Sequence, residues 1–359
     1  MPESPLRIAL IASSRHPIAQ PFAGGLEAHI WHLTRALTAA GHHVTLFAAD
    51  GSDVGTDRDS LRAEHFTPSP AAARDVSMPH YPVLEEHHAY LSLMIALANG
   101  THTFDLVHNH SLHYLPIAMA PSLDIPMLTT LHTPPTPWLE SAMTIFPGAH
   151  CAAVSEHTAR AWSHVVADIA VVPNGVDTEQ WPTGAGGPDL VWFGRLVPEK
   201  GPHVAMEVAR RTGRRLRLAG PVSDREYFAD RIAPGLDDRI VYVGHLEQPA
   251  LAQLVGASAV TLVTPRWDEP YGLVAAESLS CGTPVAGFGR GGLPEVVGHG
   301  AGVLVGRDDV EALVAAVEDA ARLDRAAVRR HAVAHCSQGA MVDRYLQVYT
   351  SMVSRPVAA

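Results

Sequence analysis

The chain has 359 residues, about twice the usual size of a single domain, with 47% hydrophobic and 18% charged residues. This composition excludes a wholly disordered chain and predicts two domains with buried cores. The formal net charge of −11 argues against nucleic acid or an anionic membrane as a partner, because both require a cationic face.

The start of the chain and its cysteines indicate the cellular compartment in which we expect the protein. Residues 1–7 lead directly into an apolar segment without a cationic leader, so we expect no secretory signal. Apolar runs are broken by Pro, Gly or His before they reach membrane-spanning length. Cys151, Cys281 and Cys336 are odd in number and too widely spaced to indicate a disulfide framework or a zinc cluster. We therefore expect a soluble, cytoplasmic protein.

Strands and helices alternate through the first half of the sequence, which indicates a doubly wound parallel sheet. The apolar run 6–12 predicts a buried strand, and a Gly24-Gly25 loop then leads into a helix over 26–40 with leucines at helical spacing. Residues 51–90 have weak periodicity and give no clear prediction. Further strands are predicted at 43–48, 106–110, 126–132 and 151–155.

A second α/β series follows the loose Gly/Pro-rich segment 182–188, which predicts a boundary between domains. Its strands are predicted at 189–194, 215–220, 240–244, 259–264 and 283–287, and a helical tail follows residue 322. The sequence thus predicts an α/β fold with two Rossmann-like lobes that face a cleft. The expected limits are 1–170 for the N-terminal lobe, 171–188 for a linker, 189–335 for the C-terminal lobe and 336–359 for a helical tail that packs back toward the N-terminal lobe.

Two carboxylates, Glu269 and Glu277, surround the predicted start of a helix near Gly272. At most about 12 Å separates them if the segment between is helical. Backbone N–H groups at the helix start lack partners within the helix and favour an anion or sugar hydroxyls. The spacing suits two polyhydroxylated rings joined by a diphosphate. The alternative is that Glu269 stabilises the helix start and Glu277 faces solvent.

Arg195 and Lys200 flank a turn after the first predicted strand of the second lobe. They are suited to binding a diphosphate, because arginine offers a planar fork and lysine a compact charge. Lys200 is the only lysine among 26 basic residues, which favours a specific role over an accidental surface position. Gly24-Gly25 permits close approach of the backbone to a phosphate, although it lacks the P-loop pattern.

Two patterns favour other functions. Gly287–Gly292 reads GxGxxG after a strand, as in nicotinamide dehydrogenases, but it stands late in the second lobe and no second strand ends in an acidic residue at the expected distance. His108, His110 and His113, with the His87-His88 pair, admit a zinc or iron site, because alternate strand residues share a face. No Asp, Glu or Cys has ligand spacing around them, so we expect no metal.

Several motifs occur in an order that resembles the retaining GT-B glycosyltransferases of family four, a group with bacterial mannosyl-, glucosyl- and N-acetylglucosaminyl-transferases. The resemblance covers nearly the whole chain and is strongest over 171–320. It rests on Gly24-Gly25, Pro173-Asn-Gly-Val-Asp177, Gly194-Arg-Leu-Val-Pro-Glu-Lys-Gly201, Glu269–Glu277 and Gly291-Gly-Leu-Pro-Glu295.

The resemblance implies a role for each matching residue. Arg195 and Lys200 would bind the diphosphate, Glu269 the donor sugar and Glu277 the ribose, while His132 would lie near the reacting carbon. The implied catalytic residues are His132, Arg195, Lys200 and Glu269. The implied donor-binding residues are Gly24, Gly25, His245, Leu246, Tyr271, Gly272, Leu273 and Glu277.

The expected activity is metal-independent, retaining transfer of a hexose from a nucleoside diphosphate sugar, UDP-linked, to a small soluble acceptor, without a cofactor. The N-terminal lobe is more acidic than basic, which favours a polar or cationic acceptor over an anionic phospholipid. A non-catalytic sugar-nucleotide-binding protein, a nucleotide-sugar epimerase and a phosphorylase of the same architecture remain open as alternatives. The expected acceptor contacts are Glu27, His29, His110 and Trp138.

Overall fold

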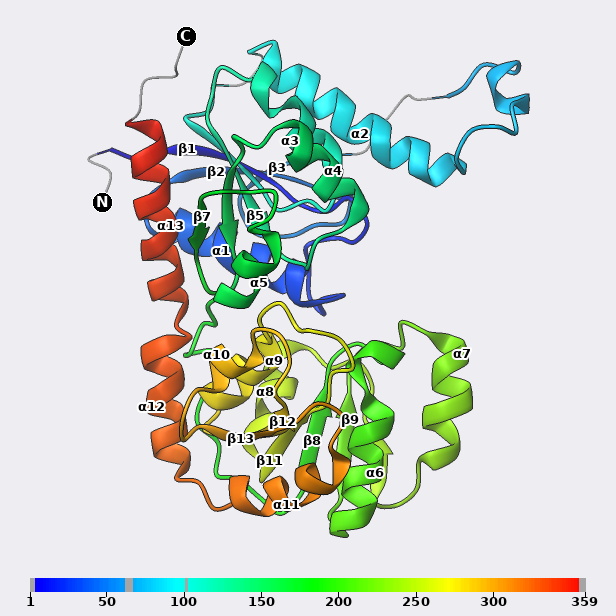
Figure 1. Cartoon of the computed structure of the whole chain (residues 1–359), viewed down its shortest axis with the longest axis vertical. Helices are drawn as coiled ribbons and strands as arrows, with labels where there is room; N and C mark the ends of the chain where they lie inside the picture. The colour runs from blue at the N-terminus through cyan, green and yellow to red at the C-terminus, as the bar shows by residue number, and fades with distance from the viewer. Residues whose placement is uncertain (1–3, 62–66, 101–102, 355–359) are drawn as a thin grey trace.

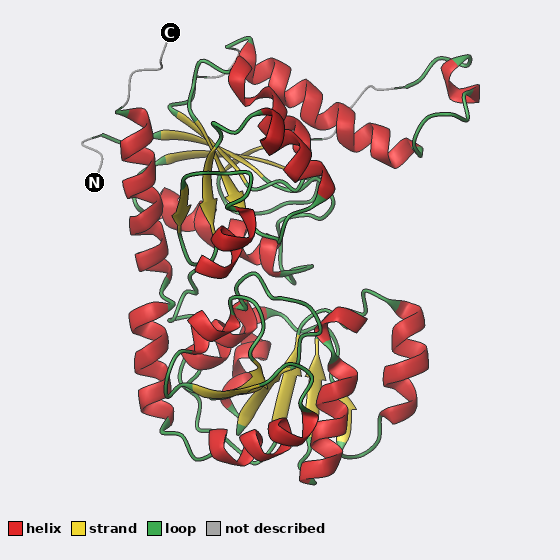
Figure 2. Cartoon of the chain, viewed as in Figure 1, coloured by secondary structure: helices red, strands yellow, loops and turns green. Residues whose placement is uncertain are grey.

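The computed structural model describes residues 4–61, 67–100 and 103–354. Within these residues the chain forms two lobes, one above the other in Figure 1, each with a parallel sheet between helices (Figure 2). This arrangement confirms the predicted α/β fold with two Rossmann-like lobes. A long C-terminal helical segment runs along one side of both lobes.

The N-terminal lobe contains a seven-stranded parallel sheet in the order β3-β2-β1-β4-β5-β6-β7. Alternate residues of β1 enter cores on opposite faces, with Ile8 and Leu10 on one side and Ala9 and Ile11 on the other. The strands are β1 (Arg7–Ile11), β2 (His43–Ala48), β3 (Asp57–Ser60), β4 (Leu106–Asn109), β5 (Met127–Leu131), β6 (His150–Ala153) and β7 (Ile169–Val171). The helices are α1 (Gly25–Ala39), α2 (Tyr81–Ala98), α3 (Tyr114–Met119), α4 (Pro137–Ile145) and α5 (Glu156–Trp162).

The C-terminal lobe repeats this plan with a six-stranded parallel sheet in the order β10-β9-β8-β11-β12-β13. The strands are β8 (Leu190–Phe193), β9 (Leu216–Ala219), β10 (Ile240–Tyr242), β11 (Val260–Val263), β12 (Val285–Phe288) and β13 (Gly302–Val305). The helices are α6 (Pro202–Thr212), α7 (Arg225–Tyr227), α8 (Gln248–Gly256), α9 (Leu273–Ser280), α10 (Leu293–Val297) and α11 (Val310–Ala320).

The C-terminal tail consists of α12 (Arg325–His335) and α13 (Gln338–Val353). Val328 and Ala332 of α12 are buried in a core of the C-terminal lobe. Tyr345 and Tyr349 of α13 are buried in the N-terminal core beside α1 and β1. The chain therefore crosses between the lobes a second time at 336–338. There the Val176 N–H donates to Cys336 O at 2.8 Å and the Gln338 N–H to Val176 O at 3.0 Å, so the two crossings are paired.

The structure differs from the sequence predictions around the interlobe segment and in residues 51–90. The predicted boundary at residue 170 falls inside β7. The Gly/Pro-rich segment 182–188 is packed rather than loose, because the Gly184 N–H donates to Cys281 O at 3.1 Å and the Gly186 N–H to Gly256 O at 2.9 Å. Strands β3, β7 and β13 and helix α2 were not predicted. Of the stretch without a prediction, residues 62–66 lie outside the described residues.

Candidate active site

The loops that follow corresponding strands of the two lobes line one cavity of about 470 Å³. In each sheet the strand order reverses beside its first strand, between β1 and β4 and between β8 and β11. Ligands of such folds bind outside the carboxyl ends of the strands at this reversal. Arg15 after β1, Arg195 after β8 and Thr264 after β11 all line the cavity. Its volume is in the range of small-molecule sites.

The cations of the C-terminal lobe are held by acidic partners. Lys200 Nζ donates to both carboxylate oxygens of Glu269, at 2.6 and 2.9 Å, and lies 5.0 Å from the centre of the Trp267 ring. The Trp267 Nε1–H also donates to Glu269 Oε1, at 2.9 Å. Arg195 Nη2 lies 3.7 Å from the Glu199 carboxylate. Two of the three ammonium protons of Lys200 face the carboxylate, which leaves one for a ligand oxygen.

Glycine determines how closely three loops of the C-terminal lobe, those after β8, β11 and β12, approach one another. Gly201 has a φ of 66°, and a Cβ there would collide with the backbone oxygen of Thr264. Gly291 has a φ of 63°, and a Cβ there would collide with the backbone of Glu269. Both positions therefore require glycine for conformation and for space. The loop carrying Lys200 and the loop carrying Glu269 are also joined by a hydrogen bond from the Arg266 N–H to Glu199 O, at 2.7 Å.

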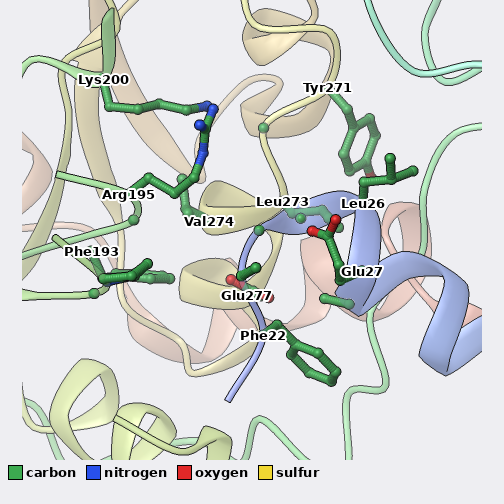
Figure 3. A pocket seen from close by; sticks show the side chains of 18 of the residues that line it. Phe22, Leu26, Glu27, Phe193, Arg195, Lys200, Tyr271, Leu273, Val274 and Glu277 are labelled. Atoms are coloured by element: carbon green, nitrogen blue, oxygen red, sulfur yellow. The ribbon is translucent and has the colours of Figure 1, made fainter. Parts of the chain in front are cut away.

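Helix α9 places Glu277 in the cavity, one turn beyond the helix start at Gly272 and Leu273. Figure 3 shows Glu277 and Glu27 directed toward the space beside Arg195. Burial raises the pKa of Glu277 from its ordinary value of 4.5 to about 8. Two neighbouring hydroxyls of a ligand that donate hydrogen bonds to the Glu277 carboxylate would stabilise its charged form and lower this pKa.

The lobes meet across the cleft through backbone groups and side chains. A Cβ at Gly25 would lie 3.1 Å from Leu273 Cδ1, so the Gly24-Gly25 segment abuts the start of α9. The His245 Nε2–H donates to the backbone oxygen of Phe22 at 3.1 Å. Glu295 of the C-terminal lobe accepts from the backbone N–H groups at the start of α5, 2.8 Å from Glu156 N and 2.8 Å from His157 N. These contacts hold the two walls of the cavity together.

Histidines lie beneath the N-terminal wall. His132 lines the cavity, and its Nε2 lies 2.9 Å from His110 Nδ1. His110 Nε2 lies 3.2 Å from His108 Nδ1, which also faces the Tyr349 hydroxyl of α13 at 2.6 Å. Burial lowers the pKa of His132 to about 3 and those of His108 and His110 well below the ordinary value. The cluster is therefore neutral at physiological pH.

Most of the residues selected from the sequence lie around the one cavity. Those that line it are Gly24, Gly25, Glu27, His132, Arg195, Lys200, His245, Leu246, Glu269, Tyr271, Gly272, Leu273 and Glu277.

Three of the four expected acceptor contacts do not line the cavity. His29 and His110 are buried behind His132, with 2% and 0% exposure. Trp138 was expected nearby because it follows His132 closely in the sequence. Helix α4 carries it away, and its half-exposed ring packs 5.2 Å from His113 and 5.4 Å from Tyr114, measured between ring centroids. Glu27 alone of these residues lines the cavity.

The histidines do not group as the sequence predicted. His108 and His110 share a face of the sheet, with ring centroids 3.9 Å apart, as strand geometry requires. His113 instead stacks on Tyr90 and Tyr114 and accepts from the Leu115 N–H at the start of α3. The third and fourth members of the cluster come from elsewhere in the sequence: His132 after β5 and His29 on α1.

Sequence reasoning missed residues whose role depends on a partner distant in the chain. Trp267 was seen only as the start of a motif, yet its indole fixes Glu269. Asn174 lines the cavity with its Oδ1 buried and unpartnered within the described residues. The Pro173–Asp177 motif, which contains Asn174, is the sequence pattern that could have identified it. The GxGxxG pattern has a packing role, because Gly292 donates its N–H to Glu269 O at 2.7 Å.

Comparisons with known proteins agree with this geometry. The family model "Glycosyltransferase Family 4" matches residues 23–180, and "Glycosyl transferases group 1" matches residues 177–333. A glycogen synthase of Mycobacterium tuberculosis is 31% identical over 372 residues, covering 90% of this chain and 88% of that protein. A D-inositol 3-phosphate glycosyltransferase of Acidothermus cellulolyticus is 27% identical, covering 93% and 87%.

Solved structures share the fold. A glycosyltransferase of avilamycin A biosynthesis has a TM-score of 0.72 at 24% identity and covers 98% of each chain. An Anabaena protein in complex with UDP and glucose has a TM-score of 0.74 at 17% identity, covering 96% of this chain and 100% of that chain.

Two facing Rossmann-like lobes with a cleft between them are the architecture of the GT-B glycosyltransferases. The chain belongs to glycosyltransferase family 4, the group that the sequence motifs resemble. Among its described residues, no helix is both long enough and apolar enough to cross a membrane.

Proposed function

We propose that this glycosyltransferase transfers a hexose, with retention of anomeric configuration, from a UDP-linked sugar to a small soluble acceptor. The observation that carries the proposal is that Arg195, Lys200, Glu269 and Glu277 line one cavity. The glycogen synthase relative and the Anabaena structure with bound UDP and glucose support a sugar nucleotide as donor. A fold neighbour from Arabidopsis thaliana was solved with ADP, so ADP is the alternative nucleotide to be tested.

The proposed chemistry rests on electrostatics that the site already holds in place. When the nucleoside diphosphate leaves, negative charge grows on its phosphates and positive charge on the sugar. Arg195, Lys200 and the N–H groups at the start of α9 would stabilise the phosphates, most strongly with water excluded by the closed lobes. These two cations would neutralise the diphosphate charge, as magnesium does in other enzymes. We therefore propose that donor binding needs no metal.

Retention follows from a same-face reaction in this proposal. A retaining glycosidase uses a carboxylate nucleophile about 5 Å from a second carboxyl group. Glu269 is already engaged by Lys200 and Trp267, which suits a sugar-hydroxyl contact better than a free nucleophile. We propose that the leaving phosphate accepts the proton of the attacking hydroxyl, and that neutral His132 orients the donor sugar.

The acceptor would enter from the N-terminal wall. Glu27, 5% exposed, lines this wall, and Arg15 at the rim lies 3.3 Å from Glu86. An acidic residue whose carboxylate faces the cavity favours hydroxyl or amine groups over a second phosphate. A small polyol or aminocyclitol-like molecule fits this chemistry.

Nucleotide binding followed by turnover tests the proposal. UDP, ADP, GDP and TDP are compared by thermal shift, and sugars of the best nucleotide are then tested for hydrolysis and transfer. Lys200→Ala should lower turnover about 10²- to 10³-fold, as expected for loss of one preorganised charge, with the folded structure retained in circular dichroism. Arg322→Ala, which removes an exposed cation paired with Asp319, is the matched control. Binding without any turnover would favour a non-catalytic binding protein, and equal turnover in both variants would refute the diphosphate assignment.

A further inference from the structure

Three histidines from separate elements meet beneath the cleft: His29 on α1, His110 after β4 and His132 after β5. Their ring centroids form a nearly equilateral triangle, 5.3 Å for His29–His110, 5.1 Å for His29–His132 and 5.2 Å for His110–His132. One ring nitrogen from each lies within 4.8 Å of the other two.

This triangle has the size of a three-histidine metal site. A zinc–nitrogen bond is about 2.0–2.1 Å, and tetrahedral angles then place the centres of two ligating imidazoles about 5 Å apart. The three ligand nitrogens now lie within 4.8 Å of one another. They must come closer together to bind one ion at this bond length. Rotation of a ring about its Cβ–Cγ bond moves the nitrogens and leaves the ring centre nearly in place, so this adjustment preserves the triangle.

His29 supplies a second, independent observation. It is only 2% exposed, yet both of its ring nitrogens are buried without a hydrogen-bond partner within the described residues. A buried polar group without a partner is destabilising and uncommon in a folded protein. An ion at the centre of the triangle would give one of these nitrogens a strong bond.

The surroundings of His110 match those of a metal ligand. Its Nδ1 faces the triangle, 2.9 Å from His132 Nε2, while its Nε2 faces His108 Nδ1 at 3.2 Å. Histidines that bind metals usually donate the other ring N–H to an outer partner, which fixes the ring. His108 is fixed in turn by Thr130 Oγ1, 2.8 Å from its Nε2. Without metal, one proton lies between His110 and His132; on binding, that proton moves to Nδ1 of His132 and all three ligands stay neutral.

We propose that His29, His110 and His132 bind one divalent transition-metal ion of the zinc class. Imidazole nitrogen suits zinc, copper and nickel, whereas magnesium and calcium require oxygen ligands. The three ligands leave a fourth tetrahedral position for water or a ligand hydroxyl, and the site adjoins the cleft because His132 lines it. The site rests on the N-terminal lobe and is separate from the cations proposed to bind the diphosphate.

Metal titration of untagged, full-length protein tests this site. Protein stripped with chelator is titrated with Co²⁺, whose visible spectrum reports tetrahedral nitrogen coordination, and then with competing Zn²⁺. We expect one equivalent per chain and an affinity at least about 100-fold weaker in His29→Leu, the size of effect seen for lost metal-site interactions. His164→Gln, which removes an exposed histidine beside Glu140, should bind as the wild type does.

Three results would overturn the site: no saturable binding by the wild type, unchanged affinity in His29→Leu, or a stoichiometry that falls in His164→Gln. His29→Gln, which stays polar, replaces His29→Leu if the latter does not fold. If neither variant folds, X-ray absorption of the zinc-loaded wild type decides, because outer-shell scattering from three imidazoles supports the site and fewer imidazoles exclude it. Nucleotide binding to the metal-free protein is measured in parallel. Loss of nucleotide binding would refute the proposed donor, and loss of metal binding would refute the histidine site, so the two failures can be told apart.

Discussion

The raised pKa of Glu277 predicts that Glu277→Gln stabilises the empty protein. An acid whose pKa rises from 4.5 in the unfolded chain to about 8 in the folded chain destabilises the fold wherever the unfolded form is ionised. The penalty is absent below pH 4.5, grows as the pH rises, and levels off above pH 8. At pH 7 the linkage relation gives about 3 kcal/mol. Water in the open cleft screens part of this, so we expect about 1–3 kcal/mol.

Urea unfolding of the wild type and Glu277→Gln at pH 5, 7 and 8.5 measures this effect. The stability difference should be small at pH 5 and largest at pH 8.5. The same substitution should weaken nucleotide binding, because a neutral amide is a poorer acceptor for ribose hydroxyls than a carboxylate. Parallel pH dependences for the two proteins would refute the raised pKa of Glu277. Increased stability with unchanged nucleotide affinity would place the ribose elsewhere.

Three other changes have defined outcomes. Gly201→Ala should destabilise the fold by about 2 kcal/mol or more in urea unfolding, since the new Cβ meets the Thr264 oxygen at a positive φ; a smaller loss would mean that the loop adapts. Tyr349→Phe should cost about 0.5–1.5 kcal/mol, because His108 Nδ1 loses the hydroxyl and keeps only His110 Nε2 as a partner; unchanged stability would contradict the bond to the hydroxyl. EDTA should leave nucleotide affinity unchanged in calorimetry, whereas a lower affinity would contradict metal-independent donor binding.

The sequence predicted the elements whose signal is local. The apolar run at β1 and the regular spacing in α1 are visible in the chain alone because burial on both faces, or on one helical face, sets their periodicity. Strand β13 escaped prediction because its residues are only partly buried at the sheet edge. Helix α2 escaped because its first half is exposed and so carries little pattern.

The site residues that could be predicted are charged residues that lie close to glycines in the sequence. Arg195, Lys200, Glu269 and Glu277 were selected on that basis, and all of them line the cavity. The Lys200–Glu269 ion pair was not predicted, because it joins two loops and depends on how closely Gly201 and Gly291 let the backbones approach. Two partners of His110 were equally inaccessible, since His29 comes from α1 and His132 follows β5.

The pairing of the two interlobe crossings at Val176 and Ser337 determines how this molecule can flex. Two tethers placed far apart would fix the angle between the lobes, because any rotation would stretch one of them. Here both tethers lie at one spot, so they act as a single pivot. A rotation of one lobe about that pivot would change the width of the cleft without stretching either crossing.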